Sequence, residues 1–163
     1  QTCALPILFP ELELKGIHIF SYMFLNKFQY IYNKMFVPEF KDAKSSEFKF
    51  IPLSEQENLA VIKKSNTVFD MQHNQQSGLT MRTIETLGAK RKIITTNRNI
   101  KNYDFYNENN ILVMDNNTLE DIEQFIKNKY EPISEAIYEK YSLHRWIVAI
   151  INEEDNDYLK KLG

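Results

Sequence analysis

The residues best suited to bind a ligand follow a short apolar segment that ends near residue 71. Residues 72–82 are polar almost throughout, contain one of the chain's 4 glycines and lead into a predicted helix. The N-terminus of a helix presents free N–H groups and partial positive charge, which favour phosphate or another anion. Gly78 lets the backbone approach a ligand, and Ser77 and Thr80 offer hydroxyl donors. This segment predicts an anion site; the alternative is a polar loop in which Ser77 only caps the helix.

Two charged residues on the same helix support the anion interpretation. Arg82 can bind phosphate through two parallel hydrogen bonds, and a cation in a first helical turn is misplaced unless an anion faces it. Glu85 lies one turn further on, where a carboxylate can accept from ribose hydroxyls. The alternative is an exposed ion pair worth a few tenths of a kcal/mol. No Gly-Lys-Ser/Thr motif follows, so the segment is not a P-loop, nor is it the three-glycine dinucleotide motif.

Other polar residues follow later apolar segments. Thr96 and Asn97 come directly after one such segment and are predicted to contribute to the same site. His73 could act as a general acid or base, but it has no Asp or Ser partner at a fixed offset, which favours a loop histidine that only forms hydrogen bonds. Asp70 and Asp115 each end an apolar segment, where a carboxylate either contacts a ligand or caps a helix. The 3 scattered histidines lack metal-ligand spacing, so no metal is expected.

Short apolar segments predict the strands that position these residues. Each has about five residues, β-branched or aromatic, as in strands that are buried on both faces. The last four begin roughly 20–25 residues apart, which leaves room for one helix between strands. Ligands bind beyond the carboxyl ends of parallel strands, so the two polar segments are expected at one edge. The predicted fold class is α/β, Rossmann-like, with a mostly parallel sheet and flanking helices. The predicted strands are 16–20, 48–51, 67–71, 92–96 and 111–115.

Capping signals and apolar periodicity predict the helices. The aromatic-rich segment 24–36 indicates a helix packed on the sheet, and His18, within the first predicted strand, is expected to be a core histidine. The expected boundaries are a capping box at Ser54 and Glu57, a helix from 77–78 that stops at Gly88, a helix capped by Thr118 with Asp121 at its third position and ended by Pro132, a helix capped by Ser134, and a helical region at 146–151.

Composition limits the protein class. The 163 residues, 43% hydrophobic with net charge −2, fit one domain that needs no disulfide or metal to fold. The single cysteine excludes an internal disulfide and a Cys-based zinc site, and the balanced charge argues against nucleic-acid binding. The most apolar stretch, 17–37, carries too many polar groups for a transmembrane helix. We expect a cytoplasmic protein, and peripheral association with the inner membrane stays open.

The first residues do not resemble a native start. Residues 1–7 match one reading frame of a common sequencing adapter; the alternative is a real, slightly apolar N-terminus. We expect a non-native leader, so that the chain is the C-terminal piece of a longer protein. The predicted divisions are 1–7 as leader, 8–46 as a partial strand and helix region, 47–151 as a Rossmann-like domain and 152–163 as a polar tail.

Three motifs, 76–85, 92–97 and 103–106, resemble a group of bacterial lipopolysaccharide or capsule biosynthesis proteins. These proteins look like glycosyltransferases of the two-Rossmann-domain (GT-B) type, and the resemblance covers roughly residues 48–141. It implies that residues 47–151 bind a nucleotide-sugar donor, which is a substrate, so that no cofactor is implied. It further implies that Glu85 holds the ribose and that Arg82 neutralises charge. The other implied donor-site residues are Gln76, Ser77, Gly78, Thr80, Thr96 and Asn97.

Two departures from this family limit the prediction. Ser77 stands where many retaining members carry a second glutamate, so the stereochemical outcome stays open. The N-terminal domain that would bind a saccharide or lipid-linked acceptor lies outside this chain, so the chain alone is expected to be inactive. One alternative is a non-catalytic module that binds a nucleotide or a partner. Another is a two-domain sugar epimerase, for whose acid/base chemistry only His73 is available.

Overall fold

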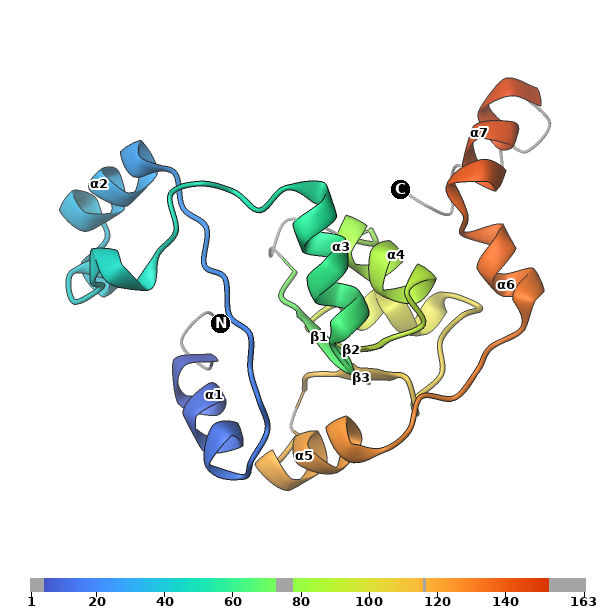
Figure 1. The fold of residues 1–163 in the computed structure, drawn as a ribbon, viewed down its shortest axis with the longest axis horizontal. Helices are drawn as coiled ribbons and strands as arrows, with labels where there is room; N and C mark the ends of the chain where they lie inside the picture. The colour runs from blue at the N-terminus through green and yellow to red at the C-terminus, as the bar shows by residue number, and fades with distance from the viewer. Residues whose placement is uncertain (1–4, 73–77, 116, 153–163) are drawn as a thin grey trace. The chain divides into compact units, whose positions relative to one another are not determined.

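The computed structural model describes residues 5–72, 78–115 and 117–152. The chain divides into two compact units, Gln1–Asn58 and Leu59–Gly163 (Figure 1). The second unit contains a small parallel sheet with helices, so the fold class is α/β, as predicted. Within the described residues, no helix is both long enough and apolar enough to cross a membrane.

The sheet of the second unit has 3 strands in the order β1-β2-β3, all parallel. They are β1 (Thr67–Asp70), β2 (Lys92–Thr95) and β3 (Ile111–Val113). Ile93 pairs with Val68 on one side and with Ile111 on the other. Every residue of the central strand β2 is buried, as its continuous run without a polar face predicts. Three of the five predicted strands are thereby confirmed, together with their parallel direction.

Helices connect and cover these strands (Figure 1). The box of Ser54 and Glu57 forms, with the Ser54 hydroxyl 2.7 Å from a Glu57 carboxylate oxygen. The box of Thr118 and Asp121 forms in the same way at 2.9 Å, so both predicted starts are confirmed. The elements are α3 (Glu55–Lys64), α4 (Met81–Gly88), the 3₁₀ turn η3 (Arg98–Asn102), α5 (Leu119–Lys127), α6 (Glu135–Lys140) and α7 (Leu143–Asn152).

The two faces of the sheet meet different elements, because side chains alternate along a strand. Ile93 packs in a core with Ile111, Ile100 and Phe105, against which Leu87 of α4 also packs. On the opposite face, Lys92 is 1% exposed and reaches α5. The helices α4 and α5 therefore contact opposite faces of the sheet. The carboxyl ends of the strands are followed by loops.

The side chain of Lys92 binds the C-terminal end of α5. Its ammonium group donates to the carbonyl oxygens of Phe125, of Ile126 at 3.0 Å and of Asn128 at 2.5 Å. The last carbonyls of a helix have no partner within the helix and carry partial negative charge, so a cation is favoured there. Burial nevertheless lowers the pKa of Lys92 to about 8. The helix ends here, at Lys127, rather than at Pro132 as predicted.

The start of α4 differs from the prediction. The helix begins at Met81, with the Thr80 hydroxyl accepting from the Thr83 N–H at 3.0 Å, rather than at residues 77–78. Thr80 takes the capping position because Asp70 holds its hydroxyl, as described below. The sequence around the helix start does not reveal this contact, because Asp70 lies at the end of β1.

The helix α4 ends at Gly88, as predicted, but a lysine rather than a glycine closes it. Gly88 is the last helical residue, and Lys90, with φ 55°, adopts the left-handed conformation that closes the helix. The Lys90 N–H bonds to the Leu87 carbonyl at 2.9 Å and the Arg91 N–H to the Thr86 carbonyl at 3.1 Å, which is a Schellman motif. Glycine usually occupies the position that Lys90 takes, so a lysine there is strained.

The first unit is built around an aromatic cluster. Its elements are α1 (Leu5–Leu14), α2 (Lys27–Phe36) and the 3₁₀ turns η1 (Pro38–Phe40) and η2 (Ser45–Glu47). Tyr30 of α2 lies 5.6 Å from Phe48 and 5.6 Å from Phe50, ring centre to ring centre, and 5.7 Å from Phe40. The predicted strand at 48–51 is therefore wrong: Phe48 and Phe50 pack on Tyr30, and Lys49 makes only a single bridge, to Phe24.

The predicted strand at 16–20 is also wrong. Gly16, with φ 80°, closes α1, and the Ile17 N–H bonds back to the Leu12 carbonyl at 3.1 Å. The residues that follow form no strand, and His18 is exposed rather than part of a core. The helix predicted within 24–36 is confirmed as α2, but it lies in a different compact unit from the sheet that it was expected to cover.

Candidate functional site

The candidate site lies at the carboxyl edge of the sheet, where β1 and β2 end beside the start of α4. The Thr96 N–H bonds to the Asp70 carbonyl at 3.3 Å, so the two strands remain paired to their last residues. The structure brings four of the predicted ligand residues to this edge: Gly78, Thr80, Thr96 and Asn97. The parallel sheet accounts for this convergence, because it directs consecutive strand ends the same way.

Asp70 joins the end of β1 to the first turn of α4. One oxygen of its buried carboxylate accepts from the Thr80 hydroxyl at 2.8 Å and from the Thr83 hydroxyl at 3.1 Å. Asp70 is therefore not itself the cap of α4: Thr80 caps the helix, and Asp70 binds the hydroxyl of that cap. A carboxylate beside a helix N-terminus interacts favourably with the helix dipole.

This pairing limits where an anionic ligand can bind. The Thr80 hydroxyl, predicted as a ligand donor, instead donates to Asp70 and accepts from Thr83. A phosphate placed directly on Thr80 would also meet the negative charge of Asp70. Any anion at this edge is therefore better placed toward the loop side or toward the exposed Arg82.

A second group of hydrogen bonds fixes both ends of the loop between β1 and α4. The Gln72 N–H donates to the Thr96 hydroxyl at 2.9 Å, and the Gln72 side-chain amide donates to the Gly78 carbonyl at 2.9 Å. The Asn97 side chain donates to the same Gly78 carbonyl at 3.2 Å and accepts from the Asn99 N–H at 2.9 Å. Thr96 and Asn97, which were predicted to line a ligand cleft, thus bind Gln72 and Gly78, the described residues on either side of the loop.

Arg82 and Glu85 lie on α4, one turn apart. Arg82 is exposed at the second residue of the helix, and Glu85 is partly buried. Arg82 is thus accessible to a ligand at the carboxyl edge. Asp115, which follows β3, forms an exposed ion pair with Arg98 of η3.

Three predicted candidates, His73, Gln76 and Ser77, lie outside the described residues. Among the residues that are described, no group of three or more His, Cys, Asp or Glu side chains is arranged to hold a metal ion.

Sequence reasoning missed Gln72 and Thr83 and left Asp70 undecided. For Asp70 a signal exists: an acid at a strand end, followed within about ten residues by Thr-x-x-Thr at a helix start, has two hydroxyls to bind. Gln72 has no comparable local signal, because its partners, Gly78 and Thr96, become neighbours only when the sheet forms.

Comparison with known protein families, with curated proteins and with solved structures finds no match to this chain. Its function is therefore inferred from its residues and their geometry.

Proposed function

We propose that the second unit binds the nucleoside diphosphate part of a nucleotide sugar at the carboxyl edge of its sheet, as the Rossmann-like donor-binding half of a GT-B glycosyltransferase. The donor sugar would be transferred to a bacterial surface polysaccharide. One observation carries the proposal: Gly78, Thr80, Thr96 and Asn97, from separate segments, converge at this edge beside the first turn of α4. The motif resemblance described above adds the reaction class.

In this proposal the roles follow from exposure and charge. Arg82, exposed in the first turn of α4, would bind the diphosphate and balance its charge as the nucleotide leaves. Glu85, one turn further, would accept from the ribose hydroxyls. Thr96 and Asn97 would act indirectly by holding Gln72 and Gly78 in place. The cytoplasmic location and the saccharide or lipid-linked acceptor belong to the same proposal.

Calorimetric titration of the chain with uridine, guanosine, adenosine and cytidine diphosphates tests the proposal. We expect one of them to bind, Arg82→Ala to weaken that binding at least about tenfold through loss of a charged hydrogen bond, and Glu85→Ala to weaken it as well. Lys129→Ala is the matched control, because it removes an exposed cation next to Asn128, at the opposite edge of the sheet. Equal binding by the wild type and the three variants would refute the assignment of the site.

The alternative of a non-catalytic binding module is favoured by a different observation. Among the described residues of the edge, the carboxylate of Asp70 and the amide of Asn97 are both held by hydrogen bonds within the protein. Release of free sugar or of nucleoside diphosphate from a nucleotide sugar, measured with the full-length gene product, separates the two functions. A module without chemistry binds the nucleotide and releases neither product.

A further inference from the structure

A small cavity lies between α4 and the sheet. Its volume is about 20 Å³, and roughly 10–15 Å³ is enough to hold one water molecule. Much of its lining is apolar and comes from the core, including Leu87, Ile93 and Phe105. Among the polar side chains that line it, Thr83 is paired with Asp70 in the network at the carboxyl edge, whereas Thr86 and Arg91 take no part in that network.

Each of these two side chains has a buried polar atom without a partner among the described residues. Thr86 is 1% exposed, and its hydroxyl has no hydrogen-bond partner among the described residues. A threonine within a helix can bond to the carbonyl one turn earlier, so a buried hydroxyl without that bond needs another partner. The Arg91 Nε–H is likewise buried without a partner in this part of the chain, although the guanidinium donates through Nη2 to the Lys63 carbonyl at 2.5 Å.

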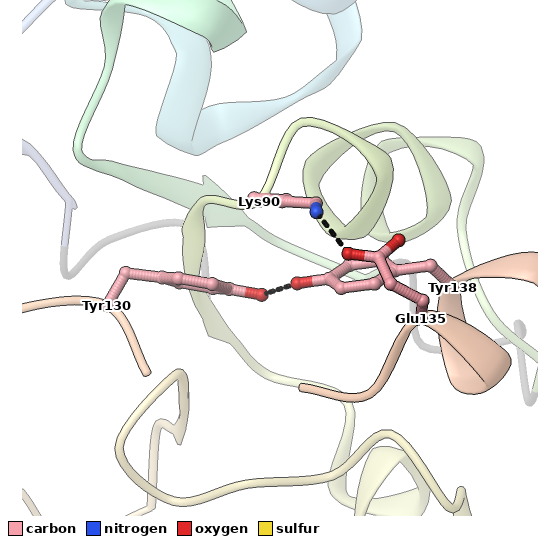
Figure 2. A network of polar contacts seen from close by, with 4 residues as sticks. All are labelled: Lys90, Tyr130, Glu135 and Tyr138. Carbon is pink, nitrogen blue, oxygen red and sulfur yellow. Dashed lines mark hydrogen bonds and ion pairs between the residues drawn. The ribbon is translucent and has the colours of Figure 1, made fainter. Parts of the chain in front are cut away.

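The other polar groups around the cavity are already paired. Tyr130 lines the cavity, and its hydroxyl shares a hydrogen bond with the Tyr138 hydroxyl; Figure 2 shows the two side chains pointing toward one another. Burial, followed by this contact, raises the pKa of the Tyr130 phenol, so the hydroxyl keeps its proton. The Asn110 side chain donates to the Glu131 carbonyl at 2.6 Å and accepts from the Glu131 N–H at 2.8 Å.

We propose that one ordered water molecule binds in this cavity and bridges the Arg91 Nε–H to the Thr86 hydroxyl. The water accepts from the guanidinium and bonds to the hydroxyl as donor or acceptor, which satisfies both buried groups. The two residues are already neighbours through the Schellman bond from the Arg91 N–H to the Thr86 carbonyl. The water is thus part of the structure that joins the end of α4 to the start of β2.

The sign of a stability change tests this proposal. If the water is bound, Thr86→Val removes one of its two ligands, and the thermal midpoint falls by about 3 °C or more. Thr86→Ser keeps the hydroxyl and restores most of the loss. Thr67→Val is the matched control: the Thr67 hydroxyl is also buried without a partner in the described residues, but it does not line the cavity. Its removal leaves the midpoint unchanged or raises it.

Without the water, Thr86→Val also removes an unpaired hydroxyl, and the midpoint is then unchanged or raised, as for Thr67→Val. That result would overturn the proposal. A crystal structure of the intact chain gives the direct readout, with a density peak within hydrogen-bond distance of both Arg91 Nε and Thr86 Oγ1 expected. Absence of the peak would contradict a bound water.

Discussion

At the scale of single residues, Asp70 is the polar group on which the candidate site depends. Its buried carboxylate accepts from Thr80 and Thr83 and faces the N-terminus of α4. Asp70→Asn keeps the shape but removes the charge, so we expect the free energy of unfolding to fall by about 1–2 kcal/mol in urea denaturation. Asp115→Asn breaks an exposed pair with Arg98 and is the control, with an expected change below about 0.5 kcal/mol. Equal losses in the two variants would contradict the role of Asp70.

The buried Lys92 predicts an unusual dependence of stability on pH. Burial lowers its pKa from 10.5 to about 8 in the folded chain. Between these values the unfolded chain holds a proton that the folded chain has lost, so stability rises with pH across this window. Relative to Lys92→Met, we expect wild-type stability to increase from pH 8 to pH 10.5, by at most about 1.4 kcal/mol per pH unit.

Urea denaturation at several pH values measures this slope. The absolute stability of Lys92→Met at neutral pH is not the readout, because the variant loses both a buried charge and the bonds that end α5. Lys129→Met removes an exposed lysine next to Asn128 and controls for the loss of one positive charge. Parallel pH curves for the two variants would show that Lys92 is not the source of the slope.

At the scale of secondary-structure elements, the end of α4 offers a clear test of backbone strain. Lys90 adopts φ 55° and also pairs with Glu135 at 2.8 Å, over the ring of Tyr138 (Figure 2). Lys90→Gly and Lys90→Ala lose these side-chain contacts equally, but only glycine relieves the left-handed conformation. We expect the glycine variant to be about 1 kcal/mol more stable than the alanine variant by thermal or urea denaturation. Equal stability would show that no strain is stored at this position.

Prediction from sequence succeeded for elements that local signals determine. The apolar runs at β1, β2 and β3 are β-branched and bounded by polar residues, and the capping boxes at Ser54 and Thr118 are complete within four residues. Prediction failed where a contact between residues far apart in the sequence determines the local structure. The run at 48–51 packs on Tyr30 of α2, and α4 begins at Met81, after the cap Thr80, because Asp70 holds the Thr80 hydroxyl.

The same distinction applies to the candidate site. The convergence of Gly78, Thr80, Thr96 and Asn97 at one edge follows from parallel strand order, which the spacing of apolar runs already predicts. Which of these side chains face a ligand does not follow from spacing. Thr80 and Asn97 have the polar groups that a ligand would need, yet the structure uses them for Asp70 and Gly78.

At the scale of the whole molecule, every proposed ligand residue that the structure describes belongs to the second unit. The sheet of that unit has two edges with different chemistry. The carboxyl edge holds Gly78, Arg82 and Thr96, whereas the opposite edge holds Lys92 and the end of α5. A nucleoside diphosphate that binds as proposed must therefore perturb residues at the carboxyl edge and leave those at the opposite edge unchanged.

Amide chemical shifts followed by NMR during a nucleoside diphosphate titration show at which edge the nucleotide binds. We predict saturable shifts at Gly78, Arg82, Thr96 and Asn97, with little change at Asn128 and Lys129 on the opposite edge. Shifts confined to the opposite edge, or no saturable shift with any of the four nucleoside diphosphates, would contradict it.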